Sequence, residues 1–202
     1  QGWISKLSYK PSQSFSLKNN HYTTNSSSLY VHNSSNVNYN NFYGVQNTSE
    51  VTFVFNPQVS SAKVFNTINY EGSNGWQVNS FISDETGPGN VVNLSAVVFD
   101  TTNPVLSYIE GAYDSAVPPN TGASATVQPI YRVGFDRKEN KYCANIINNT
   151  SVSSGEILFG RQISGIKGFY AVVKMSTDFV TDLGNYKELF AVSSNYTFAN
   201  GY

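Results

Sequence analysis

The sequence predicts an all-β protein built from antiparallel strands, and three observations support this class. The 202 residues include 14 Tyr, 13 Phe and 2 Trp, and aromatic residues, like β-branched ones, favour strands. Asn, Ser and Thr make up 66 residues and gather between short apolar runs, where turns are expected. Within those runs polar and apolar residues alternate, as in half-buried strands. We expect a propeller-blade-like or sandwich N-terminal part over 1–84, a looped insertion over 85–129 and a small C-terminal β domain over 130–202.

Four short strands are expected in the first 55 residues, at 3–9, 14–17, 29–32 and 51–55. The first places Trp3, Leu7 and Tyr9 on one face. The last ends at Asn56-Pro57, because proline cannot donate to a strand ladder. The spacing is typical of a meander, a propeller blade or a sandwich.

Two further strands are expected at 62–70 and 76–82, joined by a turn rich in Gly and Asn at 71–75. Beyond them, the clusters of turn formers at 85–90 and 117–122 interrupt any regular pattern. Residues 95–99 resemble a strand, and 106–116 fit either a strand or one short helix. These features predict the looped insertion over 85–129.

The last third of the chain has a clearer pattern. Apolar runs at 131–135 and 142–146 flank a charged segment, 136–141, which we expect to be a hairpin tip. Three more strands are expected at 157–163, 168–175 and 188–193, and Gly165 and Gly168 bracket an expected turn or bulge.

Charge and hydropathy exclude several classes of protein. Twelve basic and 13 acidic residues give a net charge of −1, whereas a domain that grips nucleic acid is normally strongly basic. The longest apolar run, Phe169 to Val173, is far shorter than the ~20 residues that span a bilayer. We therefore expect no membrane insertion by this chain.

Catalytic motifs are nearly absent. The two histidines, His21 and His32, have no cysteine or carboxylate at metal-ligand spacing, and we interpret them as polar residues at strand edges. No zinc-protease, serine-hydrolase or phosphate-loop pattern occurs. We expect no enzyme activity, no catalytic residue, no metal and no cofactor.

Other titratable residues are also interpreted as structural. The acidic pairs lie in expected turns, and we predict that they are solvated loop charges: Asp84/Glu85, Glu110/Asp114, Asp136/Glu139 and Asp178/Asp182. The last pair lacks the spacing of a 12-residue calcium loop. The single cysteine, Cys143, permits no intrachain disulfide, and we expect it to be a buried, inert thiol.

Several strings are familiar in combination: 2–11, 16–33, 41–44, 52–56, 63–72, 135–142 and 187–194. Together they resemble the C-terminal part of the tail muzzle or nozzle (stabilisation) proteins of crAss-like short-tailed bacteriophages. The likeness runs from Gly2 to about Ile82 and from Tyr131 to Ser194, and it does not include 85–129.

The resemblance implies a structural protein of the virion, at the distal end of the phage tail. The expected partners are copies of itself in a homo-oligomeric ring, other tail proteins and the remaining part of its own precursor. Genomic double-stranded DNA would pass a channel that the ring lines or closes, without sequence-specific binding. The relatives are longer and the chain starts at Gln1, so we expect a C-terminal cleavage product.

A second hypothesis is a host-glycan or receptor-binding module of the tail. Aromatic side chains in loops can stack on sugars. The expected platform is formed by Tyr39, Phe42 and Tyr43, or by Tyr108 and Tyr113.

Overall fold

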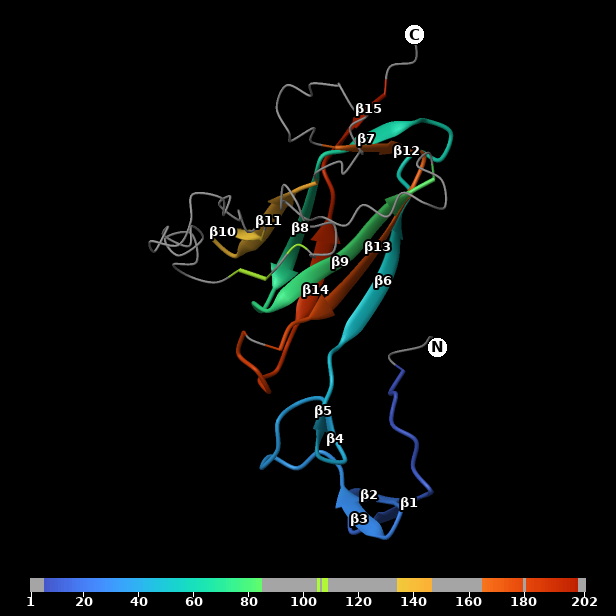
Figure 1. Cartoon of the computed structure of the whole chain (residues 1–202), viewed down its shortest axis with the longest axis vertical. Coiled ribbons are helices and arrows are strands. Elements are labelled where there is room, and N and C mark those ends of the chain that lie inside the picture. The colour runs from blue at the N-terminus through green and yellow to red at the C-terminus, as the bar shows by residue number, and fades with distance from the viewer. Residues whose placement is uncertain are drawn as a thin grey trace, which may run out of the picture. The chain divides into compact units, whose positions relative to one another are not determined.

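The computed structural model describes residues 6–84, 105, 107–108, 134–146, 165–179 and 181–199. In this part of the chain every regular element is a strand, and all the strand pairs are antiparallel (Figure 1). The predicted all-β class is confirmed, while the propeller-like or sandwich layout stays a prediction. The described residues contain no helix long and apolar enough to cross a membrane.

The chain forms two compact units. Unit 1 consists of Gln1–Thr48 with Leu183–Tyr186, and unit 2 of Ser49–Asp182 with Lys187–Tyr202. Residues 1–84 contribute to both units, and the three segments expected from the sequence stay a prediction. Most of the expected insertion, 85–129, lies outside the described residues.

Unit 1 contains a three-stranded sheet in the order β1-β2-β3 and a two-stranded ribbon, β4-β5. The strands are β1 (Gln13–Leu17), β2 (Asn20–Asn25), β3 (Ser28–Val31), β4 (Asn41–Phe42) and β5 (Val45–Gln46). Lys18 and Asn19 join β1 to β2 with φ of 49° and 64°, and positive φ at both central residues suits the twist of a two-residue hairpin turn. β1 and β3 match the prediction, whereas the polar β2 was not predicted.

In the described part of unit 2 the strands form three sheets, ordered β10-β11-β8-β14, β6-β13-β9 and β12-β7-β15. The third lies at one end of the unit (Figure 1). The earlier strands are β6 (Glu50–Phe55), β7 (Lys63–Phe65), β8 (Thr67–Gly72) and β9 (Trp76–Ser83). The later strands are β10 (Asp136–Lys138), β11 (Lys141–Asn145), β12 (Ile166–Gly168), β13 (Ala171–Thr177), β14 (Leu189–Ser193) and β15 (Tyr196–Phe198).

At two neighbouring places the chain passes from one sheet of unit 2 to another. The expected strand 62–70 divides at Asn66 into β7 and β8, which belong to different sheets. Beside it, the chain passes from β14 to β15 at residues 194–195, and the Asn66 amide donates to the Asn195 carbonyl at 2.7 Å. On the other side, the Ile146 amide donates to the Asn66 carbonyl at 2.8 Å. Asn66 therefore holds the junction between two sheets.

The core of unit 2 collects buried side chains from all three sheets, as alternation predicts. β8 turns Ile68 and Tyr70 inward, and β13 turns Val173 and Met175 inward. In β9 the inward positions change parity between Val78 and Phe81. The reason is a β-bulge, since Ser80 pairs with Lys174 and Val78 with Met175, which leaves the residue between them unpaired.

Some expected elements differ from the structure. Residues 6–9, the described part of the first expected strand, are not a strand. The hairpin at 136–141 is confirmed, but its tip is only Glu139-Asn140, because Asp136–Lys138 already pairs with β11. Gly165 has φ of 99°, but the turn or bulge expected between Gly165 and Gly168 is wrong, because Ile166–Gly168 is strand β12 and pairs with β7 in regular register. The expected runs at 95–99, 131–133 and 157–163, and 106–116 apart from 107–108, lie outside the described residues.

Candidate functional site

Both histidines lie on one face of the β1-β2-β3 sheet, which we call the inner face. Thr23, at the centre of this face, is fully buried. Its hydroxyl lies 2.7 Å from Nε2 of His32 and 3.0 Å from the hydroxyl of Tyr43. The two imidazoles stack with centroids 5.0 Å apart, and His21 Nε2 lies 2.8 Å from the Ser14 hydroxyl.

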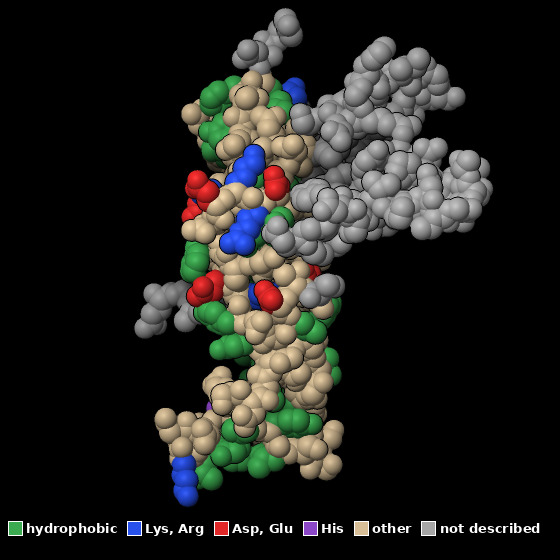
Figure 2. Space-filling view, turned by 90° about the vertical axis from the view of Figure 1, so that its left-hand side faces the viewer, with side chains coloured by type: hydrophobic (Ala, Val, Ile, Leu, Met, Phe, Trp, Pro, Cys, Tyr) green, Lys and Arg blue, Asp and Glu red, His purple; other side chains and the backbone are tan. Residues whose placement is uncertain are grey.

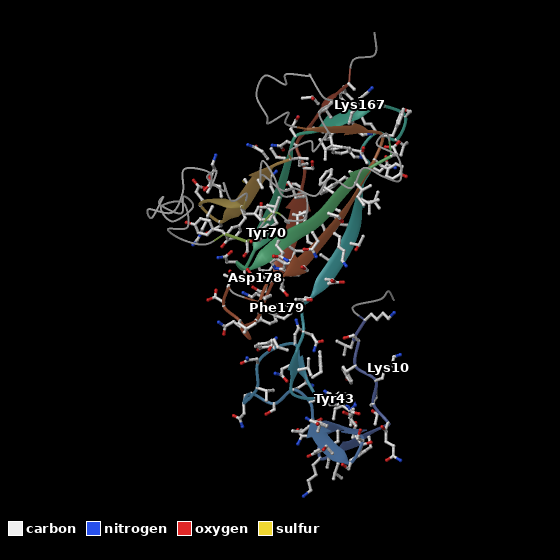
Figure 3. All side chains as sticks on the ribbon, in the orientation of Figure 1. Lys10, Tyr43, Tyr70, Lys167, Asp178 and Phe179 are labelled. Atoms are coloured by element: carbon white, nitrogen blue, oxygen red, sulfur yellow. The ribbon has the colours of Figure 1, made fainter. Side chains whose placement is uncertain are left out.

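Aromatic rings cover this inner face. Tyr9 stacks on His32 at 5.0 Å and on Phe42 at 4.6 Å, and Tyr43 meets Tyr30 edge-on at 4.6 Å. Tyr43 lies among these side chains of unit 1 (Figure 3). Both histidines contribute to a small aromatic core. The prediction of a strand edge is wrong for His21, which lies on the central strand β2, whereas His32 directly follows the edge strand β3.

The environment of His32 disfavours its charged form. Desolvation by burial, and then the neighbouring His21, lower the pKa of His32. Unit 1 contains no Asp or Glu in its sequence, so it holds no carboxylate that could stabilise an imidazolium. Among the described residues, no group of three or more His, Cys, Asp or Glu could hold a metal ion.

The opposite face of the same sheet carries apolar side chains, and we call it the outer face. Phe15, Tyr22 and Val31 form one cross-strand row, with the rings of Phe15 and Tyr22 stacked at 5.5 Å. Leu29 and Leu17 flank this row. Apart from Tyr22, these side chains have exposed fractions between 43% and 60%. The sequence did not predict this face because it did not predict β2, the strand that brings β1 and β3 into one sheet. The exposed apolar residues themselves lie on β1 and β3.

In unit 2, polar groups from distant parts of the chain form a hydrogen-bonded set that we call the polar lock. Its members are Ser73, Asn74, Trp76, Ser107, Asp178, Thr181, Lys187 and Glu188. The Asp178 carboxylate accepts the Thr181 amide at 2.8 Å and the Ser107 hydroxyl. Asp178 lies just beyond the end of β13 (Figure 3).

A lysine and a backbone carbonyl complete the polar lock. Nζ of Lys187 donates to the carbonyls of Thr181, at 2.7 Å, and Asn74, at 3.0 Å. The Glu188 carbonyl accepts the Ser73 amide and the Trp76 indole, each at 3.0 Å. Apart from the bond between Lys187 and Thr181, these contacts join segments more than 100 residues apart, and they give the lock a structural role.

The residues of the predicted acidic pairs lie in different environments. Glu139 and Asp182 are exposed in turns, which confirms solvated loop charges there, whereas Asp136 is exposed but lies in strand β10. For Asp84 and Asp178 that prediction is wrong. Asp84 Oδ1 accepts the backbone amides of Phe169, at 2.7 Å, and Tyr170, at 3.2 Å. Such charge-assisted hydrogen bonds stabilise a carboxylate, so Asp84 makes an internal contact. Glu85, Glu110 and Asp114 lie outside the described residues.

The prediction for Cys143 is also wrong in part. Tyr142 and Ala144 are buried, so alternation turns Cys143 to the other face of β11, where it is half-buried. Lys63 was not singled out, although it is fully buried. Its Nζ donates to the carbonyls of Gln58, at 2.9 Å, and Ser61, at 2.7 Å. In the sequence Lys63 is only a lysine within an apolar run, and nothing in that pattern indicates this internal contact.

The aromatic platform expected for sugars is not assembled as predicted. Phe42 and Tyr43 are half-buried in the aromatic core of unit 1, while Tyr39 is exposed. Tyr39 instead pairs with Tyr186, with ring centroids 5.2 Å apart. Tyr108 is half-buried, and Tyr113 lies outside the described residues.

The described elements and sites belong to a β-structured protein, and the comparison with protein families specifies its class. Residues 37–149, more than half of the chain, match the family model of a bacteriophage structural protein. The chain belongs to this family, the Crassvirus muzzle protein C-terminal domain. It is a structural component of the virion tail. The match includes 85–129, which the resemblance did not cover, and no curated protein matches the chain.

Proposed function

We propose that this chain is a non-enzymatic subunit of a homo-oligomeric ring, the muzzle or nozzle at the distal end of the tail, where it lines or closes the DNA exit channel. Membership of the muzzle family supports the role in the tail, and the polar lock supports the non-enzymatic part of the proposal. Its carboxylate and its amine are both satisfied by backbone and hydroxyl groups of the same chain. Such contacts stabilise a rigid body and leave these groups unsuited to acid–base chemistry.

The charge pattern supports a channel through which DNA passes without being held. Basic and acidic side chains are interspersed on the face in view (Figure 2). Lys141 pairs with Glu71 at 2.8 Å and Lys174 with Glu50 at 3.1 Å. The hydrogen bond to Glu71 raises the pKa of Lys141. Paired lysines release few counterions from DNA, so they contribute little to non-specific affinity.

The ring can be tested on material from virions. Native mass spectrometry of the assembly released from the tail should show one closed stoichiometry of this chain, because head-to-tail contacts that close generate a single ring size. A distribution of chain numbers, or a single copy per tail, would contradict the proposed ring. Absence of polysaccharide clearing by the same material would support the non-enzymatic role.

We further propose that the chain is released from a longer precursor by cleavage. The description of the family as a C-terminal domain supports this. Intact-mass analysis of the virion protein tests it, and one uncut polypeptide longer than this chain would contradict it.

A second candidate function is binding of a host glycan or receptor. The favouring observation is the pair Tyr39 and Tyr186, both with exposed fractions of 60% and with rings tilted by 58°. Exposed tyrosines offer a face for stacking and a hydroxyl for hydrogen bonding. Reproducible glycan-array binding that is lost in Tyr186→Ala would favour this candidate, and an array without binding would exclude it.

A further inference from the structure

The two compact units carry opposite net charges. Unit 1 contains three lysines, Lys6, Lys10 and Lys18, and none of the 13 acidic residues of the chain. The other nine of the 12 basic residues lie in unit 2 with all 13 acidic ones, so unit 2 has a net charge of −4 and unit 1 of +3. A net charge of −1 for the whole chain conceals this division.

The charged lysines of unit 1 are available to a partner. All three are exposed. Lys18 forms the β1–β2 turn directly after Leu17 of the outer face. The outer face itself is a contiguous apolar surface on a small sheet whose other face is already covered by aromatic rings. Exposed apolar patches of this kind, rimmed by polar residues, mark interaction surfaces.

We propose that the outer face of unit 1 docks on unit 2 of a second copy of this chain. The opposite net charges of the two units favour this partner, because unit 1, with a net charge of +3, would face unit 2 of the second copy, with a net charge of −4. Contacts between two copies of unit 1, or two copies of unit 2, would juxtapose like charges. The contact is therefore heterologous, the type that closes into rings. This inference rests on the proposed homo-oligomeric ring and specifies which surfaces form it.

Cross-linking identifies the partner surface directly. A zero-length carbodiimide reagent joins amines to carboxylates, and unit 1 has no side-chain carboxylate. In an assembly of the full chain made from equal amounts of nitrogen-14 and nitrogen-15 protein, we expect mixed-isotope links from Lys6, Lys10 or Lys18 to Asp or Glu of unit 2. An assembly whose intermolecular links all join unit 2 to unit 2 would overturn the inference.

Substitutions test the outer face itself. Leu17→Asn with Leu29→Asn should weaken self-association of the full chain by about tenfold or more in sedimentation velocity, because two exposed apolar anchors are lost. Lys18→Glu should weaken it at low salt and have a smaller effect at high salt, where surface charges are screened. The matched control is Val37→Asn, an exposed valine of unit 1 outside the β1-β2-β3 sheet, which should leave association unchanged. Circular dichroism checks that each variant is folded.

The outcomes separate this inference from the ring itself. If the chain assembles and the double variant associates as tightly as the parent, the outer face is not the contact, although the ring stands. If the parent chain is monomeric throughout the micromolar range, both the inference and the proposed ring are wrong. If it is monomeric but binds anionic phospholipid vesicles through Leu17 and Leu29, the face serves a lipid surface and the inference is overturned.

Discussion

The indole Nε1 of Trp76 donates a hydrogen bond to the backbone carbonyl of Glu188, 3.0 Å away in space and 112 residues further along the chain. The same oxygen accepts the amide of Ser73 at 3.0 Å and its hydroxyl at 3.3 Å. Three donors thus converge on one carbonyl, next to the edge strand β14. The contact fixes the start of β14 against the start of β9, so it is a good point at which to test the rigidity of unit 2.

Trp76→Phe keeps an aromatic ring but removes this donor. We expect it to lower the free energy of unfolding by about 1 kcal/mol for the hydrogen bond, and Trp76→Ala by roughly 3–5 kcal/mol because a large cavity forms. Urea unfolding followed by circular dichroism measures both. Phe190→Ala is the control, since Phe190 is 72% exposed and surface changes usually stay within about 0.5 kcal/mol. Equal stability of Trp76→Phe and the parent would show that the hydrogen bond is unimportant.

Two glycines with positive φ separate backbone strain from crowding. Gly44 has φ of 79° and open space where a β-carbon would stand, whereas at Gly75, with φ of 100°, a β-carbon would lie 2.6 Å from Nζ of Lys187. Gly44→Ala should cost about 1 kcal/mol from backbone conformation alone. Gly75→Ala should cost roughly twice as much or more, because the lysine must leave its two carbonyls as well. Calorimetry of the two variants compares them, and equal costs would exclude a role for Lys187.

We expect unit 1 to lose stability in acid because His32 must then become charged. The pKa of His32 is lowered in the folded state, so between the folded and unfolded pKa values the unfolded chain binds more protons, and stability rises with pH. The stabilisation by neutral His32 is complete above the ordinary histidine pKa of about 6.5 and is lost as the pH falls through the folded value. The facing titratable groups are His21 and the phenols of Tyr9, Tyr30 and Tyr43.

Hydrogen exchange of β1–β3 at neutral and at mildly acidic pH measures this effect. Protection should fall in acid in the parent chain and change less in His32→Gln, which cannot become charged. Because β6, β9 and β13 of unit 2 contain no histidine, their protection serves as an internal reference. A parent chain whose β1–β3 protection is independent of pH would refute the prediction.

The balanced surface predicts that the chain does not hold duplex DNA. Fluorescence anisotropy with a labelled duplex should show no affinity that falls with added salt, because the whole chain has a net charge of −1 and several lysines of unit 2 are engaged in internal contacts. Reversing charge with Glu50→Lys and Glu71→Lys provides the positive comparison and should create salt-dependent binding. Tight, salt-sensitive binding by the parent chain would contradict a channel that lets DNA slide.

Local alternation was sufficient for much of the fold. It predicts the strands that become β1, β3, β6, β9 and β14, because each has polar and apolar residues in period two. It does not predict β2, whose residues are almost all polar and which is a strand only because it lies between β1 and β3. It also cannot divide the run 62–70, since the change of sheet at Asn66 depends on carbonyls and amides from residues 146 and 195.

The burial of individual side chains was also only partly predictable from the sequence. Period two defines the two faces of β11 but not which of them is buried, so the sequence leaves Cys143 and Tyr142 as equal candidates for the core. Packing decides: Tyr142 stacks on Tyr70 at 4.6 Å, and burial of Tyr70, and then the neighbouring Tyr142, raise the pKa of Tyr70, so its phenol stays neutral. Asp84 and Asp178 look like loop charges until their partners, up to 86 residues away, are known.

The amino-acid sequence alone therefore determined the β class, many of the strands and the absence of a strongly basic surface, because these depend on neighbouring residues and on composition. Only the tertiary structure decided which strands share a sheet, which polar groups become internal contacts and where the boundary between a basic and an acidic unit falls. Those properties depend on pairings between residues far apart in the chain, and the pairings form only when the whole chain buries its apolar faces together.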